Sequence, residues 1–186
     1  MPQLSVVIIA KDEAQRLAPC LASAAPVADE LLVLVDDSTQ DDTAGVAARY
    51  GARVEWTPWQ GFRATKQQAT DKAQHAWVLS LDADERLSPA LQNSILAWKK
   101  TEPAAKGYCM HRLTNYCGHW VRHSGWYPDT KLRLFQRSHI AWAGGALHEY
   151  LAATDPAQAG PYPLLSGDLL HYSFATLEAH VAKINR

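Results

Sequence analysis

Two carboxylates one residue apart, Asp82 and Asp84, follow a short apolar run near the middle of the chain. Carboxylate oxygens are hard ligands, and two of them on an irregular strand end can turn toward one divalent cation. The other explanation is structural. Ser88 and Pro89 supply an N-cap and a first-turn proline, so the acids could belong to a solvated turn before a helix. The Asp-x-Asp pattern alone leaves a metal site and a capped turn equally open.

Acidic residues also follow two earlier apolar runs, residues 4–10 and 31–35. The acids after these runs are Asp12, Glu13, Asp36 and Asp37. If the runs are parallel strands, their carboxyl ends meet at one edge of a sheet, where ligands of open α/β folds bind. Carboxylates gathered in one place repel one another unless a cation or hydrogen-bond donors offset the repulsion. The recurrence therefore favours a cation-assisted ligand site, although each cluster alone also has an N-cap explanation.

The elements that must position these acids alternate along residues 1–100. Runs of buried-strand character are separated by segments of helical spacing, which predicts a mostly parallel sheet flanked by helices, with right-handed crossovers. The expected strands are residues 4–10, 31–35, 52–56 and 77–81. Four helices are expected between and after these strands. The first carries Leu17, Cys20, Leu21 and Ala24, with Pro19 in its first turn, and the second is capped by residues 41–43 and ends before Gly51. The third and fourth are expected over residues 62–74 and 88–100.

The second half of the chain has a different, mixed character. Residues 107–113 and 131–137 resemble strands, and the loop between them, residues 115–129, is dense in Trp, His, Gly and Tyr. Loops of this length are usually functional or disordered, and the aromatic content favours order. A further connection is expected over residues 152–167, and a helix from about Ala175 runs to the last residue without a C-cap, as in a truncated chain. The predicted fold class is α/β.

Composition excludes several classes of protein. A net charge of -1 argues against a general nucleic-acid binder. Three cysteines without CxxC spacing indicate reduced thiols in a cytoplasmic protein. Residues 4–10 lack a preceding basic segment and are followed by Lys11, Asp12 and Glu13, unlike a signal peptide. No stretch approaches the roughly 20 apolar residues that span a bilayer.

The phosphate-binding loops of common nucleotide folds are absent. No G-x-G-x-x-G follows residues 4–10, and the chain has no G-x-x-x-x-G-K-[ST]. A diphosphate would therefore need a metal and a few cations. Polar residues share one face of the helix expected over residues 62–74, namely Arg63, Lys66, Gln67 and Thr70. The alternative is that this face is simply solvated.

Several motifs in order resemble those of family 2 glycosyltransferases, which have the GT-A fold. They are residues 5–13, 35–43, 59–62 with Lys66-Gln67, and 79–85. Residues 125–129, 133–135 and 147–149 resemble the subgroup that adds glucose or a related sugar to the inner core of bacterial lipopolysaccharide. The resemblance implies a single GT-A-like catalytic domain over residues 1–186, with a nucleotide-sugar half (1–100) and an acceptor half (101–186).

The resemblance further implies an inverting, metal-dependent transfer of a hexose. The donor would be a nucleotide-diphosphate sugar, in this family usually UDP-linked, and the acceptor a hydroxyl of a glycan or glycolipid. Asp84 would bind Mg²⁺ or Mn²⁺ directly, with Asp82 nearer the ribose or a metal-bound water. His171 could complete the metal shell, since imidazole suits Mn²⁺, or could be a hydrogen-bonded core residue. The implied nucleotide-sugar residues are Ala10, Asp12, Glu13, Asp36 (preferred to Asp37), Lys66, Gln67 and Asp82.

Two acids could be the general base that takes the acceptor proton. Glu149 matches by position the acid that serves as base in this fold and is preferred. Asp129 could instead fix the aromatic loop by bonding Arg133 or its own turn. His148, next to Glu149, is a second candidate imidazole ligand. The implied acceptor-binding residues are Trp120, Arg122, Trp126, Tyr127 and Arg133, although tryptophans also fill the cores of small domains.

Other functions stay open at this point. An aspartate-nucleophile phosphatase would have Thr or Val where Arg86 stands, and a nucleotidyltransferase would have a Gly- and Arg-rich loop at residues 10–16. A non-enzymatic alternative is a sugar-binding module, or a fragment that binds a nucleotide sugar without turnover. The preferred interpretation places the protein in the cytoplasm, with peripheral contact to the inner membrane surface.

Overall fold

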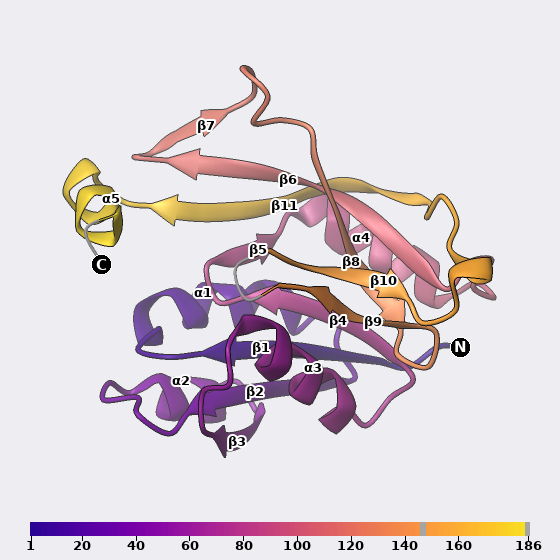
Figure 1. Ribbon diagram of the computed structural model, residues 1–186, viewed down its shortest axis with the longest axis horizontal. Coiled ribbons are helices and arrows are strands. Elements are labelled where there is room, and N and C mark those ends of the chain that lie inside the picture. Colours follow the sequence, from indigo (N-terminus) through magenta and orange to yellow (C-terminus); the bar gives the residue numbers. More distant parts are fainter. Residues whose placement is uncertain (146–147, 185–186) are drawn as a thin grey trace.

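The computed structural model describes residues 1–145 and 148–184. Within these residues a nine-stranded sheet has the order β3-β2-β1-β4-β8-β6-β11-β5, with β7 paired to β6 (Figure 1). The parallel strands are β1 (Leu4–Ala10), β2 (Glu30–Asp36), β3 (Arg53–Thr57) and β4 (Trp77–Asp82). The mixed part contains β5 (Glu85–Leu87), β6 (Gly107–Tyr116), β7 (His119–Val121), β8 (Asp129–Gln136) and β11 (Leu164–Phe174). The prediction of an α/β fold with a mixed second half is confirmed.

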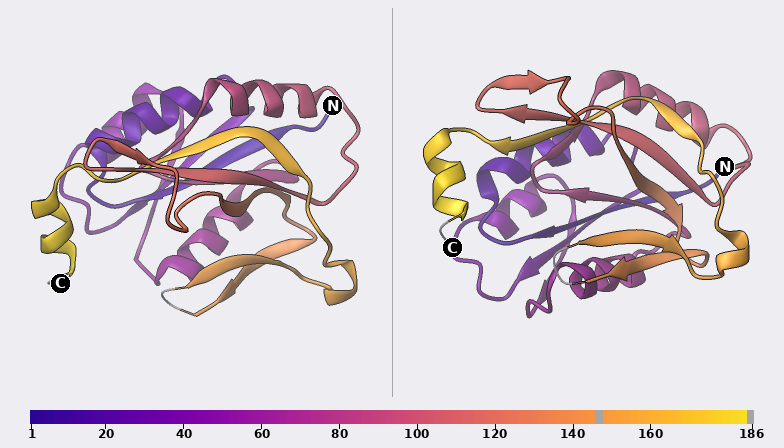
Figure 2. Two further views of the ribbon diagram at one scale, coloured as in Figure 1. Left: turned by 90° about the horizontal axis from the view of Figure 1, so that it is seen from above. Right: turned by 45° about the horizontal axis from the view of Figure 1, so that its top comes forward.

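Helices cover both faces of the sheet. They are α1 (Ala14–Ala24), α2 (Thr43–Arg49), α3 (Phe62–Lys72), α4 (Pro89–Lys99) and α5 (Leu177–Ile184), with a short 3-10 helix at Pro156–Gln158. Figure 2 shows α1, α2 and α4 on one face, and α3 on the other beside the hairpin of β9 (Ile140–Gly144) and β10 (Glu149–Ala153). This layering follows from the apolar sequence of the central strands.

The central strand β1 is buried on both faces because its alternate side chains point to opposite sides. Val6 and Ile8 pack in the cluster that contains residues of α1, α2 and α4. Val7 and Ile9 pack in a second cluster with Ala69 of α3. A strand covered on both faces needs a continuous apolar run, as residues 4–10 provide.

The acidic strand ends meet at one edge, as the sequence predicts. Strand β1 pairs in parallel with both β2 and β4, with Ala10 opposite Val35 and Ile9 opposite Asp82. The residues that follow β1, β2 and β4 therefore lie along the same rim of the sheet.

The structure corrects several local expectations. Helix α1 begins at Ala14, so Pro19 lies inside it and not in its first turn; the buried face of this helix offsets the lost backbone hydrogen bond. The loop 115–129 contains β7, which forms a hairpin with β6. The connection predicted over 152–167 is shorter, because β10 and β11 occupy its two ends.

Strands β5 and β9 are not predicted from sequence. Strand β5 has three residues and exists through its pairing with β11, far away in the chain. Residues 146–147, and residues 185–186 at the end of the helix expected from about Ala175, lie outside the described residues. In the described part of the chain no helix is long and apolar enough to cross a membrane.

Candidate active site

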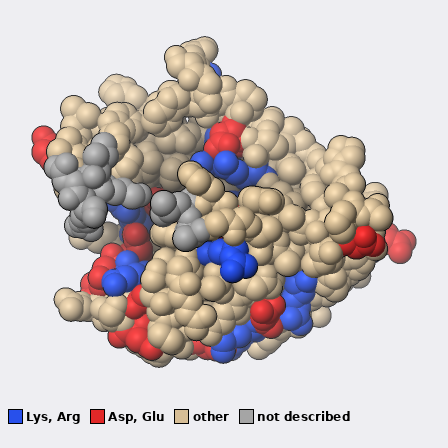
Figure 3. Space-filling model, viewed as in Figure 1, with Lys and Arg blue, Asp and Glu red and all other residues tan. Residues whose placement is uncertain are grey.

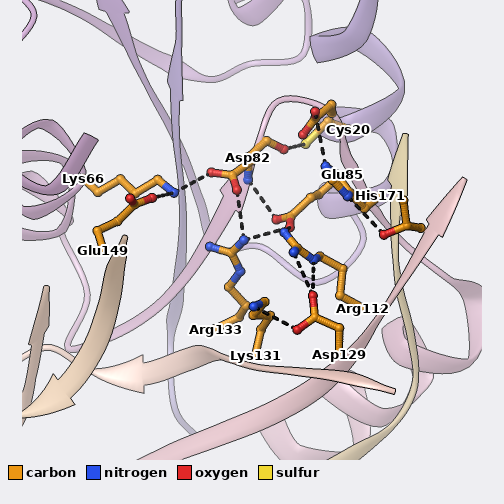
Figure 4. A network of polar contacts seen from close by, with 12 residues as sticks. Cys20, Lys66, Asp82, Glu85, Arg112, Asp129, Lys131, Arg133, Glu149 and His171 are labelled. Atoms are coloured by element: carbon orange, nitrogen blue, oxygen red, sulfur yellow. Dashed lines mark hydrogen bonds and ion pairs between the residues drawn. The ribbon is translucent and has the colours of Figure 1, made fainter. Parts of the chain in front are cut away.

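Asp82 lies at the end of β4 between two cations (Figure 4). Its Oδ1 is 2.8 Å from Lys66 Nζ, and its Oδ2 is 2.9 Å from Arg133 Nη2. Burial alone would raise the pKa of Asp82, but Arg133 and Lys66 outweigh burial and hold this pKa well below its usual range. Because both oxygens already face cations, the arrangement does not fit Asp82 as a direct metal ligand. It fits the alternative role, in which Asp82 lies near the ribose or a metal-bound water.

Lys66 connects Asp82 to Glu149. Its ammonium is also 2.9 Å from Glu149 Oε1, although the two residues are 83 positions apart. Helix α3 directs this side chain inward, so that it is only 5% exposed, and Trp142 of β9 covers it with the ring centroid 4.9 Å from Nζ. The alternative of a solvated face therefore does not hold for Lys66. One buried ammonium is shared by the candidate base and the candidate donor-side acid.

Arg133 joins Asp82 to a second buried carboxylate, Glu85. The distance from Arg133 Nη2 to Glu85 Oε1 is 2.7 Å, and Glu85 Oε2 accepts the Asp82 backbone N–H at 3.0 Å. Burial raises the pKa of Glu85, although Arg133 opposes the shift. Arg133 was expected to contact the acceptor, but its side chain is only 6% exposed. In this position it holds the two acids at the end of β4.

Asp129 is held by two other cations. Arg112 Nη2 lies 2.7 Å from Asp129 Oδ2, and Lys131 Nζ lies 2.9 Å from Oδ1. In the structural alternative, Asp129 would bond Arg133 or its own turn, but in the described part of the chain its ion-pair partners are Arg112 and Lys131. Although burial acts in the opposite direction, these two cations lower the pKa of Asp129. This environment favours a structural role for Asp129 over that of a base.

Replacing Arg133 with Met should lower the free energy of unfolding by about 3–5 kcal/mol, because it leaves Asp82 and Glu85 facing each other at a buried site without their shared cation. Urea denaturation followed by circular dichroism measures this change. The matched control is Lys131→Met, whose side chain is 38% exposed and whose loss should cost about 1 kcal/mol or less. An equal loss of unfolding free energy in both variants would contradict a special role for Arg133 between the two buried acids.

Asp84 and His171, the two expected metal ligands, lie beside each other. Their closest atoms, Asp84 Oδ2 and His171 Nε2, are 3.5 Å apart, because β11 pairs with β5 just after the Asp-x-Asp segment. The other ring nitrogen, Nδ1, is 3.3 Å from Thr114 Oγ1. A tautomer that donates from Nδ1 to Thr114 leaves the Nε2 lone pair directed toward Asp84, a common arrangement around ligating histidines.

The chemistry of these donors fits a divalent cation that is completed by substrate. Among residues 1–145 and 148–184, no group of three or more His, Cys, Asp or Glu side chains could hold a metal by itself. Mg²⁺ sites for nucleotides typically use one or two carboxylates together with substrate phosphates and waters. The residues that could provide the protein part of such a site are Asp84 and His171. His148 lies in the wall of a separate cavity with Glu149 and is not joined to them.

Two cavities meet at Asp82. One, of about 320 Å³, is lined by Ala10, Trp59, Phe62, Asp82 and Asp84, among others. The other, of about 450 Å³, is lined on its inner side by Lys66, Asp82, Arg133, Trp142 and Glu149. In the space-filling view, acidic and basic side chains lie next to each other and do not form a patch of one sign (Figure 3). A ligand with two chemically different ends could occupy both cavities with its middle at Asp82.

Asp36, at the end of β2, has one satisfied and one unsatisfied oxygen. Oδ1 accepts the backbone N–H of Ser38 at 2.7 Å and also its hydroxyl, and these bonds lower the pKa of Asp36. Oδ2 is buried and has no hydrogen-bond partner in the described residues. A buried unpaired carboxylate oxygen is unusual and indicates a missing donor. The neighbouring Asp37 is exposed.

Two other predicted nucleotide-sugar residues have structural partners. Asp12, with a positive φ of 51°, accepts the backbone N–H of Gln40 at 2.7 Å and so joins the turn after β1 to the turn after β2. Gln67 accepts the Trp142 backbone N–H at 2.9 Å and donates to Asp71 at 2.8 Å. The side-chain amide of Gln67 is thus occupied at both ends. Glu13 and Ala10 line the cavities at the rim.

The aromatic loop is ordered by edge-to-face packing. Trp120 packs on Tyr172 with ring centroids 5.4 Å apart, and Trp126 packs on Tyr116 at 5.9 Å. Tyr127 donates its hydroxyl to Asp168 at 2.9 Å. Arg122 is exposed and lies 6.0 Å from the Tyr127 ring. Trp120 and Trp126 keep exposed faces, in contrast to the tryptophans that fill the core, Trp77, Trp98 and Trp142.

The order of these features along the chain matches a known family. The model of glycosyl transferase family 2 matches residues 5–150, which include the acidic strand ends, Lys66 and Glu149. The chain belongs to glycosyltransferase family 2. A likeness at the level of fold agrees with this, since a mannosyltransferase from Pyrobaculum calidifontis, solved with GDP-Man and Mn²⁺, superposes with a TM-score of 0.66 at 14% identity. That match covers 100% of this chain and 61% of the mannosyltransferase chain.

Named relatives are also glycosyltransferases. An uncharacterized glycosyltransferase of Rickettsia typhi is 30% identical over 100% of this chain, which spans 65% of the length of that relative. The lipopolysaccharide core biosynthesis glycosyltransferase LpsC of Rhizobium meliloti is 25% identical, over 98% of this chain and 68% of LpsC. The family membership excludes a phosphatase and a nucleotidyltransferase for this domain.

The sequence analysis missed Glu85 and Arg112. Glu85 immediately follows the Asp-x-Asp segment and is fully buried, and Arg112 lies 3.8 Å from it. The sequence did contain a signal for Glu85. It is the third acid, after Asp82 and Asp84, to follow the apolar run that ends at Leu81, and the segment is too short to form a solvated acidic face. Glu85 fixes the backbone at the end of β4, because it accepts the Asp82 N–H and pairs with Arg133.

Proposed function

We propose that this family 2 domain catalyses an inverting, metal-dependent transfer of a hexose from a nucleotide-diphosphate donor, UDP-linked, to a glycan hydroxyl. The observation that carries the proposal is the Lys66 bridge between Asp82 and Glu149, together with two cavities that are both lined by Asp82. A donor that spans Asp82 brings its anomeric carbon toward Glu149. The arrangement thus separates a leaving-group side from an acceptor side.

On the acceptor side, Glu149 would take the proton of the attacking hydroxyl. The new bond forms between that oxygen and the anomeric carbon, the bond from this carbon to the diphosphate breaks, and the nucleoside diphosphate leaves. Lys66 donates to Glu149 Oε1 and so holds this side chain in position before the reaction. General-base assistance of this kind typically contributes ~10² to 10⁴ in rate.

On the leaving-group side, charge must be neutralised. A Mg²⁺ or Mn²⁺ ion held by Asp84 and His171 would supply positive charge to the departing diphosphate. Asp82 and Asp36 would bind the ribose and base of the nucleotide, and the unpaired Oδ2 of Asp36 supports this role. The Pyrobaculum protein, solved with GDP-Man and Mn²⁺, supports a nucleotide sugar and a divalent cation as ligands.

The acceptor in this proposal is lipopolysaccharide core or a related glycolipid. The name of LpsC supports this choice, and the exposed faces of Trp120 and Trp126 offer stacking surfaces for sugar rings. The domain would then act in the cytoplasm, with peripheral contact to the inner membrane where a glycolipid acceptor is presented.

Titration calorimetry with UDP, with and without Mn²⁺, followed by a screen of nucleotide sugars for metal-dependent hydrolysis, tests the proposal. We expect nucleotide binding that EDTA abolishes, together with turnover of at least one donor. Metal-dependent binding without turnover of any donor would indicate a fragment that binds but does not transfer. Absence of metal-dependent nucleotide binding would favour a sugar-binding module.

A further inference from the structure

Two large aromatic side chains stand at the surface at the start of α3. Trp59 and Phe62 are 43% and 46% exposed, and their rings pack edge to face with centroids 4.8 Å apart. Trp59 lies in the connection after β3, and Phe62 is the first residue of α3. Exposed aromatic pairs are costly in water, and grouped ones usually mark a ligand surface. No role is assigned to this pair by the chemistry described so far.

The pair lines the same cavity as Asp82 and Asp84. This cavity, of about 320 Å³, also contains Ala10 at the end of β1. The cavity that contains Glu149 shares Asp82 with it but includes neither aromatic residue. The aromatic pair therefore faces the leaving-group side of the site.

Because Glu149 lines one cavity and the aromatic pair lines the other, we can infer which part of the donor contacts Trp59 and Phe62. The transferred sugar must lie between the diphosphate and the acceptor oxygen, which places it on the side of Glu149. The nucleoside is attached to the opposite end of the diphosphate and extends into the cavity of Trp59 and Phe62. A nucleobase is flat, and aromatic side chains stack on any base through its π-face.

We propose that Trp59 and Phe62 form the stacking platform for the nucleobase of the donor. This inference rests on the proposed function and adds a specific site for one part of the substrate. Stacking accepts every base, so the platform contributes affinity, while hydrogen bonds from the strand ends select the base. The platform also positions the diphosphate next to Asp84, because base and diphosphate are joined through one ribose.

Titration calorimetry of Trp59→Ala with two ligands tests this inference, with whichever of Mg²⁺ and Mn²⁺ supports nucleotide binding. UDP carries a base, and inorganic pyrophosphate lacks one. We expect UDP to bind about 5-fold to 100-fold more weakly than to the unchanged protein, and pyrophosphate to bind equally well. Trp59→Phe should recover most of the UDP affinity, and Phe62→Ala should show a loss in the same direction.

The matched control is Trp56→Ala, because Trp56 is 54% exposed on β3 and lines neither cavity. Its UDP affinity should be unchanged, and thermal melting of each variant shows that it is folded. Unchanged UDP binding in Trp59→Ala, or equal weakening of UDP and pyrophosphate, would overturn the inference and leave the proposed function intact. If the unchanged protein binds none of UDP, GDP and ADP with metal, the proposed function fails and this inference with it.

Discussion

Glu149→Gln should lower kcat by about 10²-fold to 10⁴-fold while the affinity for nucleotide and metal is retained. The amide has the shape of the carboxylate, and its oxygen can still accept from Lys66 Nζ, which lies 2.9 Å from Glu149 Oε1. It cannot take a proton from the acceptor hydroxyl. The loss should therefore fall on kcat, as measured by chromatographic assay of transfer, with little change in calorimetric affinity for UDP.

Asp129→Asn is the comparison that separates the two candidate bases. Asp129 is held by Arg112 and Lys131, so its change should affect stability more than the chemical step. Full activity in Glu149→Gln together with loss in Asp129→Asn would move the base to Asp129. Full activity in both variants would mean that the proposed mechanism does not operate in this domain.

Asp84→Ala should abolish transfer and metal dependence together. Asp84 is the carboxylate that faces His171 Nε2 at 3.5 Å, and in the proposed mechanism its loss removes the cation that would neutralise the leaving diphosphate. Each ~1.4 kcal/mol of lost charge stabilisation in the transition state lowers the rate about tenfold, and a bound cation supplies several kcal/mol. Activity measured across a titration of Mn²⁺ and of Mg²⁺ reports both effects.

A suitable control for Asp84→Ala is Asp155→Ala. Asp155 is exposed and caps the short 3-10 helix at Pro156–Gln158 through Ala157 N–H at 3.0 Å. This change removes one carboxylate outside the site and should leave the metal titration unchanged. Normal metal-dependent turnover in Asp84→Ala would refute the assignment of Asp84 as the metal ligand.

The sequence predicts well what depends on local pattern. The apolar runs at residues 4–10 and 77–81 become β1 and β4, because a strand buried on both faces requires such a run. The acids that follow them meet at one edge because the strands are parallel, a consequence of the short connections through helices. The rim of the site was therefore predictable before any contact was known.

Pairing between distant residues was not predictable in the same way. Lys66 and Glu149 are separated by 83 positions, and Arg133 and Glu85 by 48. Polar residues on a helix face have the same pattern whether they face water or a buried acid, so Lys66 could not be distinguished from Arg63 by spacing. The burial of Arg133 likewise depends on where β8 inserts beside β4, a choice made by the whole sheet.

The shared ammonium of Lys66 has a consequence for the timing of the reaction. Before transfer, one positive charge is divided between Asp82 and Glu149. If Glu149 is the base, its protonation cancels one of these two attractions at the moment when the departing group becomes more negative. The same lysine then faces the donor side with its full charge, without any movement of the backbone. Through the side chain of Lys66, proton transfer to Glu149 would thus be coupled electrostatically to the negative charge that develops on the departing nucleoside diphosphate.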